Sequence, residues 1–434
     1  MGRFSPQGPL RGTVAVPGDK SISHRALILS ALARGRSEIQ GLSRGGDVMS
    51  TAAAMRAFGA RIEPQGEGWA VDGVGVGALL QPAQALDMGN SGTSARLLMG
   101  LAATHPITAT FTGDASLSRR PMNRVIAPLT RLGAAFEAAP GGRLPLTLRG
   151  IAPAAPLLHR MEVASAQVKS ALLLAALNTP GITRVLERVP TRDHSERMLK
   201  GAGADLWAED TSEGRLISLR GEAELKPQRL FVPRDPSQAA FPLVAALVVP
   251  GSEVRVDSVG INPTRAGLFE ILRAMGADLR FENRREEGGE PVADIVARHS
   301  ALTAVDVPPE LAPSMIDEFP IFFIAAAFAQ GTTRTSGLEE LRVKESDRLS
   351  AMAAGLSAIG VPATQSPDGL QVTGTGGDPL PGGGEPVDPR LDHRIAMSFA
   401  VAGLHARAAI EVADMSPVDT SFPGFAAMLE GLRP

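Results

Sequence analysis

The chain contains no cysteine among its 434 residues. Disulfide bonds, thiolate metal ligands and a cysteine nucleophile are therefore excluded. The lack of cysteine does not identify a compartment by itself, but it suits a cytosolic enzyme.

Long hydrophobic runs are also missing. The longest strongly apolar stretch, from Phe319 to Ala329, is shorter than the ~20 residues that a membrane-spanning helix requires. The segment from Met1 to Leu10 has no apolar core of the kind that a signal peptide needs. We therefore expect a soluble, cytoplasmic protein that has no membrane partner.

The chain has no excess of positive charge, since its formal net charge is −3. This balance argues against a nucleic-acid partner held by a broad basic face. A small anionic substrate is still compatible with it, because a cleft can be locally positive. The seven histidines are scattered and form no zinc motif, so we expect no metal cofactor. A nucleophile elbow is also absent, which leaves covalent serine chemistry without support.

What the chain does contain is a repeat. An amphipathic helix, a Gly-Ala pair or near variant and an apolar strand recur at intervals of roughly 70–85 residues. These copies lie at 55–62, 129–136, 198–206 and 271–279, with a weaker one at 356–362 and a last helix at 428–432. A second feature, a short strand, a polar loop and a helix rich in Ala and Leu, occurs six times. Its copies lie at 14–32, 86–103, 161–177, 230–247, 305–328 and 387–404.

Six α/β units in a chain too long for one core predict two domains of three units each. The segments beginning Val16-Pro17-Gly18-Asp19 and Val232-Pro233-Arg234-Asp235 nearly match, and we place the domain crossings there. The predicted domains are 19–231, and 1–18 together with 232–434. The Ala- and Leu-rich helices are apolar nearly all round, so each unit should bury one helix and expose another. An ordinary open α/β sheet is the alternative.

Polar residues gather at the starts of these buried helices. A helix N-terminus offers unpaired N–H groups and partial positive charge, which suit a phosphate or a carboxylate. In the first loop, Asp19 separates Gly18 from Lys20, so the spacing of a nucleotide-binding P-loop fails. Lys20, Ser21 and Arg25 can nonetheless hold one anion together, whereas His24 is as readily explained by packing.

Further loops carry hydroxyl, amide, carboxylate and guanidinium groups. They span 89–96, 117–124, 165–170, 191–194, 315–320, 341–349 and 392–394. Taken singly, each is equally explained as an ordinary helix cap or an ion pair such as Glu345 with Arg348. Taken together, they favour a site for anionic ligands.

Four of these motifs, in this order, resemble the enolpyruvyl transferase family, in the branch that uses shikimate 3-phosphate as acceptor. They are Asp19-Lys20-Ser21-x-Ser23-His24-Arg25, Gly89-Asn90-x-Gly92-Thr93, Arg342-Val343-Lys344-Glu345-Ser346-Asp347-Arg348 and Asp392-His393-Arg394. The resemblance covers essentially the whole chain, and Arg120-Pro121-Met122-x-Arg124 is similar to the class II form. It implies an α/β fold of two domains, each of three βαββαβ units with buried inner helices, an inside-out α/β barrel. Substrates would bind in the cleft between domains that close on them.

The resemblance also implies a role for individual residues. Shikimate 3-phosphate would be bound by Lys20, Ser21, Arg25, Ser165, Ala166, Gln167, Arg192, Asp317 and Lys344. Phosphoenolpyruvate would be bound by Lys20, Gly92, Arg120, Gln167, Arg348 and Arg394. The 5-hydroxyl would attack C2 of phosphoenolpyruvate, and a tetrahedral intermediate would then lose phosphate. Asp317 would be the base for the hydroxyl, while Glu345, with Lys20 nearby, would exchange the proton at C3.

No metal or organic cofactor is implied, and we expect a monomer. Because Gly92 leaves room that an alanine methyl would fill, we also expect inhibition by glyphosate, the herbicide that occupies the phosphoenolpyruvate pocket of this family. Two alternatives are a transferase acting on UDP-N-acetylglucosamine and a non-catalytic binder of phosphorylated metabolites. The first typically uses a cysteine, which this chain lacks. The second would be expected to have lost Lys20, Asp317 or Glu345.

Overall fold

The computed structural model describes residues 1–433, which divide into two compact units. The inserted unit comprises 18–232 and the short segment 287–290. The split unit comprises 1–17, 233–286 and the chain from Pro291 onward. Each unit has its own cluster of buried apolar side chains. The expected α/β fold with two domains is confirmed.

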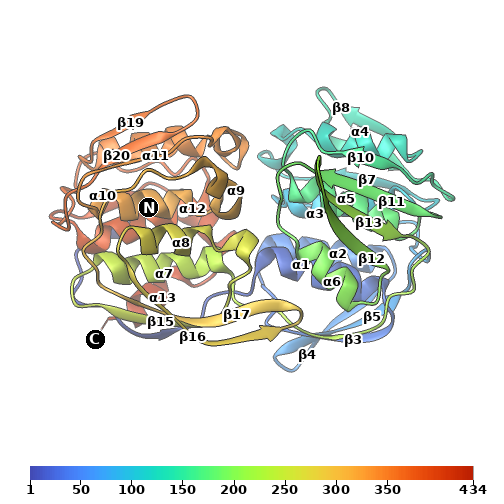
Figure 1. Ribbon diagram of the computed structural model, residues 1–434, viewed down its shortest axis with the longest axis horizontal. Coiled ribbons are helices and arrows are strands. Elements are labelled where there is room, and N and C mark those ends of the chain that lie inside the picture. The colour runs from blue at the N-terminus through green and yellow to red at the C-terminus, as the bar shows by residue number, and fades with distance from the viewer. Residues whose placement is uncertain (434) are drawn as a thin grey trace. The chain divides into compact units, whose positions relative to one another are not determined.

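In the inserted unit, three helices are buried along nearly their whole length. These inner helices are α1 (Lys20–Leu32), α3 (Gly92–Ala102) and α5 (Ala166–Ala176). Three outer helices bury one face only: α2 (Gly46–Ala57), α4 (Asn123–Arg131) and α6 (His194–Gly201). An inner and an outer helix therefore alternate along the chain, as the repeat predicts (Figure 1).

Each repeat of the inserted unit contributes one four-stranded sheet. The first is β14 (Arg229–Phe231), β3 (Arg34–Gln40), β5 (Gly68–Val74) and β4 (Arg61–Gln65) in spatial order. The second is β6 (Leu86–Asp87), β7 (Thr108–Thr112), β9 (Arg143–Arg149) and β8 (Ala135–Ala139). The third is β10 (Leu158–Arg160), β11 (Ile182–Glu187), β13 (Gly214–Arg220) and β12 (Leu206–Thr211). In each sheet the first pair is parallel and the other two pairs are antiparallel.

The split unit repeats the helical pattern. Its inner helices are α7 (Pro236–Val248), α10 (Phe319–Phe328) and α12 (His393–Ala402). Its outer helices are α8 (Gly267–Ala274), α11 (Arg348–Ala358) and α13 (Phe425–Gly431), and a one-turn helix α9 (Ala312–Met315) precedes α10. No single helix of residues 1–433 is long and apolar enough to cross a membrane. The pair 309–315 and 319–328 passes that test only jointly, by length and composition, and bends by 119°.

The sheets of the split unit become progressively smaller. The first is β16 (Asp278–Glu287), β17 (Glu290–Arg298), β15 (Glu253–Gly260) and β2 (Arg11–Val14). The second is β18 (Thr332–Arg334), β20 (Leu370–Thr373) and β19 (Ala363–Gln365), and the third pairs β1 (Gly2–Phe4) with β21 (Ile410–Val412). Within the described residues the six sheets are separate and do not form one continuous closed barrel. The first residues of the chain thus complete a repeat begun near residue 387, where Val387 bridges Val412.

At the crossings at 17/18 and 232/233, an inner helix of one unit follows a strand of the other unit. The strand before α1 is β2, which pairs with β15 in the split unit. The strand before α7 is β14, which pairs with β3 in the inserted unit. Pro17 and Pro233 lie at these crossings. Proline has no backbone N–H, and it is tolerated here because both positions lie outside the strands of the sheets.

Inner helices approach one another closely where a side chain is missing. A Cβ on Gly100 of α3 would lie 2.2–2.6 Å from backbone atoms of Ala171 in α5. Contact at that distance is possible only for glycine, so this position sets the separation of the two helices. Their N-termini, which carry the polar motifs, are thereby held in a fixed relation within the inserted unit.

Candidate active site

Most inner helices begin with a side chain that caps the first turn. Backbone N–H groups two or three residues further on donate to the side chains of Asp19, Ser91, Ser165, Asp235 and Asp392. An N-cap satisfies one of the four orphan N–H groups of a helix start. The ordinary capping explanation is therefore correct for these loops, and the residues beside the caps carry the remaining chemistry.

At the start of α1, Lys20 pairs with Asp47 in the first turn of α2. The Lys20 Nζ lies 2.8 Å from the Asp47 Oδ2, and both side chains are partly exposed. Such a pair contributes little stability on its own, but it holds the ammonium group at the helix terminus. Asp47 was not predicted from the sequence, although an acid in the first turn of a helix is the signal that could have found it.

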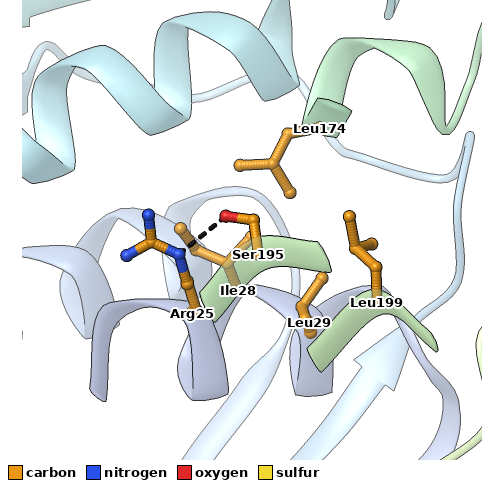
Figure 2. Close-up of a pocket in the computed structure, with 6 residues that line it drawn as sticks. All are labelled: Arg25, Ile28, Leu29, Leu174, Ser195 and Leu199. Atoms are coloured by element: carbon orange, nitrogen blue, oxygen red, sulfur yellow. Dashed lines mark hydrogen bonds between the residues drawn. The ribbon is translucent and has the colours of Figure 1, made fainter. Parts of the chain in front are cut away.

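Arg25, one turn further along α1, is buried with only 5% of its surface exposed. Its Nη1 donates to the Ser21 carbonyl at 2.8 Å, and Nε donates to Ser195 Oγ at 2.7 Å (Figure 2). Burial lowers the pKa of Arg25 to about 10. The guanidinium therefore still carries its charge at neutral pH.

His24 belongs to the packing of the unit. Its ring is fully buried and its Nδ1 lies 2.7 Å from Thr51 Oγ1. Burial lowers the pKa of His24 to about 3, so the ring is neutral at physiological pH. Of the two explanations considered from the sequence, the structure favours the structural one.

The start of α3 is joined to the start of α5 through Gln167. The Gln167 Oε1 accepts from Arg96 Nη1 at 2.8 Å, and its Nε2 donates to Thr93 Oγ1 at 3.0 Å. Ser165 and Ala166, at the start of the same helix α5, are partly exposed. Arg96 is a further candidate for binding an anion. It was given no individual role from the sequence, although it lies in the loop 89–96.

Gly92 and Arg120 lie next to each other. A Cβ on Gly92 would be 3.4 Å from Arg120 Nη1 and 2.8 Å from Arg96 Nη1. Arg120 Nη2 donates to Asn90 Oδ1 at 3.1 Å, so the arginine is tied to the loop before α3. The glycine thus keeps open the space in front of two guanidinium groups.

Arg192 lies in the loop between β11 and α6 and is partly exposed. The same loop is held by the buried Lys169, whose Nζ donates to the Thr191 carbonyl at 3.3 Å. Lys169 Nζ also pairs with Glu187 at 2.9 Å and with Glu196 at 2.7 Å, all nearly without exposure. The anchor was not predicted, because these residues come together only through tertiary contacts.

In the split unit, Arg348 is surrounded by three carboxylates. Its nitrogens lie 3.2 Å from Asp317 Oδ1 and 2.6 Å from Glu345 Oε2. A third contact, from Nε to Asp392 Oδ2, is 2.8 Å long. Burial alone would lower the pKa of the Arg348 guanidinium, but the carboxylates outweigh it and raise that pKa above its ordinary value. Asp392 therefore both caps α12 and orients an arginine.

Asp317 also contacts the two remaining predicted residues of this unit, Arg394 and Lys344. Its backbone carbonyl accepts from Arg394 Nη1 at 3.1 Å, and Lys344 Nζ lies 3.9 Å from its carboxylate. Desolvation lowers the pKa of Lys344, although the Asp317 carboxylate opposes that shift. Asp317, Lys344, Glu345, Arg348 and Arg394, which lie up to 77 residues apart in sequence, thus form one cluster.

In each unit, residues predicted to bind anions therefore lie at or near the N-termini of helices and include cationic side chains. The split unit adds two partly exposed carboxylates, those of Asp317 and Glu345. Among residues 1–433, no group of three or more His, Cys, Asp or Glu side chains could hold a metal ion. The arrangement is typical of a class of protein that binds small anionic ligands at helix N-termini, here with carboxylates beside the cations.

Comparisons with known proteins identify the family. A family model described as EPSP synthase (3-phosphoshikimate 1-carboxyvinyltransferase) matches residues 4–429. A protein of that name from Novosphingobium aromaticivorans is 64% identical over 432 residues, which are 99% of this chain and 98% of the relative. The EPSP synthase structure from Acinetobacter baumannii is 43% identical with a TM-score of 0.89, covering 99% and 98% of the two chains. The chain belongs to the EPSP synthase family.

Proposed function

We propose that the residues at the helix N-termini of the two units carry out the reaction of this family. In that reaction the enolpyruvyl group of phosphoenolpyruvate passes to the 5-hydroxyl of shikimate 3-phosphate, and phosphate is released. The observation that carries the assignment is the cluster around Asp317, where every residue predicted for this half of the site lies in contact with another. Both substrates are multiply anionic, which matches the surplus of cations beside the helix starts.

Shikimate 3-phosphate is proposed to bind mainly to the inserted unit. Its proposed contacts there are Lys20, Ser21, Arg25, Ser165, Ala166, Gln167 and Arg192, with Asp317 and Lys344 from the split unit. Two planar guanidinium groups and two helix starts suit a phosphate and a carboxylate on one small molecule.

Phosphoenolpyruvate is proposed to bind to Lys20, Gly92, Arg120, Gln167, Arg348 and Arg394. The glycine matters because it leaves the first turn of α3 open in front of Arg120. Arg348 is already neutralised by carboxylates, so it supplies directed N–H donors rather than net charge. Arg120 contributes positive charge beside the phosphate, and Lys20 contributes with it although its ammonium group also pairs with Asp47.

Two carboxylates are proposed to move the protons. Asp317 takes the proton from the attacking hydroxyl, and Lys344 and Arg348 beside it hold the carboxylate in place. Glu345 protonates C3 of phosphoenolpyruvate and later removes a proton from it, with Lys20 assisting. The cationic groups stabilise the charge that develops in the tetrahedral intermediate.

The remaining predictions complete this proposal. The substrates are held in a cleft between the predicted domains 19–231 and 1–18 with 232–434, which close on them. The enzyme acts as a cytoplasmic monomer without metal, organic cofactor, nucleic acid or membrane partner.

The first test is phosphate release from phosphoenolpyruvate in the presence of a chelator, with shikimate 3-phosphate or UDP-N-acetylglucosamine as acceptor. Release with shikimate 3-phosphate alone is expected. Release with the nucleotide sugar alone would assign a different acceptor. Binding of both substrates without release under any condition would indicate the non-catalytic binder.

The same assay tests the proposed base. Asp317→Ala should bind shikimate 3-phosphate but lose most of its turnover. Asp378→Ala, which changes an exposed aspartate of the same unit, is the matched control and should be unaffected. Near-normal turnover in Asp317→Ala would remove this residue from the role of base.

A further inference from the structure

Two buried arginines of the chain are held in opposite ways. Arg348 is bonded to three carboxylates. The hydrogen bonds of Arg25 all go to neutral oxygens: Ser195 Oγ at 2.7 Å, Ser170 Oγ at 2.6 Å and the Ser21 carbonyl at 2.8 Å. A buried charge without a bonded counter-charge is unusual unless a ligand provides one.

The two serines form a pair of their own. Ser170 lies on α5 and Ser195 on α6, and their hydroxyl oxygens are 2.7 Å apart. Both are buried, with 0% and 4% of their surface exposed. Each hydroxyl accepts an N–H of Arg25, and one of them also donates to the other. The pair thereby joins three helices around a single guanidinium group.

The charge of Arg25 is left available by this arrangement. Of the nearby acids, Glu196 has the largest electrostatic effect on Arg25, but its carboxylate is paired with Lys169 Nζ at 2.7 Å. A guanidinium has five N–H donors, and the contacts within residues 1–433 use three of them. One N–H on each terminal nitrogen is left for a ligand.

The cavity beside Ser195 indicates why a polar partner is needed to orient Arg25. A small cavity lies next to Arg25 and is lined by Ile28, Leu29, Leu174 and Leu199, together with Ser195 (Figure 2). In Figure 2 the guanidinium points away from these apolar side chains while its Nε faces Ser195. Without the hydroxyls, only the bond from Nη1 to the Ser21 carbonyl would orient the guanidinium beside this apolar space.

We infer that Ser170 and Ser195 are positioning residues, which hold one edge of Arg25 so that its other edge receives the anionic acceptor substrate. The inference rests on the proposed function, in which Arg25 binds shikimate 3-phosphate. Hydroxyls do this better than carboxylates would, since they fix the guanidinium without neutralising the charge that the ligand needs.

The test measures the Kd of shikimate 3-phosphate by calorimetry in the absence of phosphoenolpyruvate, together with the KM of each substrate. Ser195→Ala should raise the Kd and KM of shikimate 3-phosphate by about tenfold, as expected for one hydrogen bond to a charged group. The KM of phosphoenolpyruvate at saturating acceptor should stay within about twofold, since that ligand does not use Arg25.

Three further variants separate positioning from packing. Ser195→Thr keeps the oxygen and can place its methyl in the adjacent cavity, so it should retain wild-type affinity. Leu199→Ala enlarges the same cavity without touching Arg25, and should lower Tm while leaving the Kd unchanged. In an Arg25→Ala background, Ser195→Ala should cause no additional loss, because the two effects act through one group.

The outcomes are distinguishable. If the unaltered enzyme neither binds nor converts shikimate 3-phosphate, the proposed function and this inference both fail. If it does both normally and Ser195→Ala has an unchanged Kd, only the inference fails. Equal losses in Ser195→Ala and Leu199→Ala would also overturn it, since they would show a general packing effect.

Discussion

Replacing Lys169 with methionine should destabilise the inserted unit severely. The Lys169 ammonium is the bonded cation of two buried glutamates, Glu187 at 2.9 Å and Glu196 at 2.7 Å. Removing one partner of a buried ion pair costs about 3–5 kcal/mol, because the other charge is left without compensation. For a unit of this size each kcal/mol corresponds to about 2–4 °C in Tm, so a fall of roughly 6–20 °C is expected.

The stability lost in Lys169→Met should increase with pH. Burial already raises the pKa of Glu187 above its ordinary value, although Lys169 opposes the shift. A carboxyl whose pKa is raised on folding contributes stability that is fully present below its unfolded pKa of about 4.3 and is lost as pH rises through the folded value. Without Lys169, Glu187 loses the charge that lowers its pKa and takes up a proton more readily. The penalty of Lys169→Met should therefore be larger at pH 8 than at pH 5.

Scanning calorimetry at those two pH values checks both statements. Lys200→Met, which changes an exposed lysine on the same helix as Glu196, is the matched control and should leave Tm nearly unchanged. Adding Glu187→Gln and Glu196→Gln to Lys169→Met should recover most of the lost stability. A fall in Tm below about 2 °C for Lys169→Met at pH 8 would refute the reasoning, since the expected cost is several kcal/mol.

Other positions give equally direct predictions. Gly92→Ala places a methyl 2.8 Å from Arg96 Nη1 and 3.4 Å from Arg120 Nη1. It should therefore raise the KM of phosphoenolpyruvate, and also the inhibition constant of glyphosate, which we expect to inhibit the unaltered enzyme. Steady-state assays check this, and unchanged constants would exclude the crowding. Gly100→Ala should lower Tm by several degrees, because its Cβ would lie 2.2 Å from the backbone of α5; an unchanged melting curve would contradict it. His24, with a pKa of about 3, should show no titration between pH 5 and 8 by NMR, with His24→Asn assigning the signal. Because unfolded histidine takes up a proton below a pKa of about 6.5, His24 should also reduce stability as pH falls below that value.

Much of the fold could be predicted from local patterns. A helix that is apolar all round, such as α10 or α12, is recognisable as buried because hydrophobic periodicity is a local property. The alternation of inner and outer helices followed from the spacing of the Gly-Ala turns. The family itself was recognisable from motifs at the helix starts, since those motifs are short and contiguous.

Contacts made across the fold could not be predicted in this way. Nothing in the local sequence of Arg25 indicates that Ser170 and Ser195 hold its guanidinium. His194 Nδ1 likewise lies 2.7 Å from Glu290 Oε1. Glu290 is at the tip of the hairpin of β16 and β17, and this tip, residues 287–290, belongs to the inserted unit although most of the hairpin belongs to the split unit. Such pairings depend on the packing of whole elements and not on spacing along the chain. The roles proposed for individual substrate contacts remain predictions.

The pairing of β1 with β21 has a consequence for synthesis on the ribosome. Gly2 lies opposite Val412, so β1 must wait for a strand that is synthesised about 400 residues later. The inserted unit is nearly contiguous and can fold while translation continues, since domains fold as units as they leave the exit tunnel. The split unit cannot complete the β1–β21 sheet until about 400 further residues have been made, which takes roughly 20–80 s at about 5–20 residues per second. During that interval β1 is an unpaired edge, and its short length, its central Arg3 and the nearby Pro6 limit its pairing with other nascent chains.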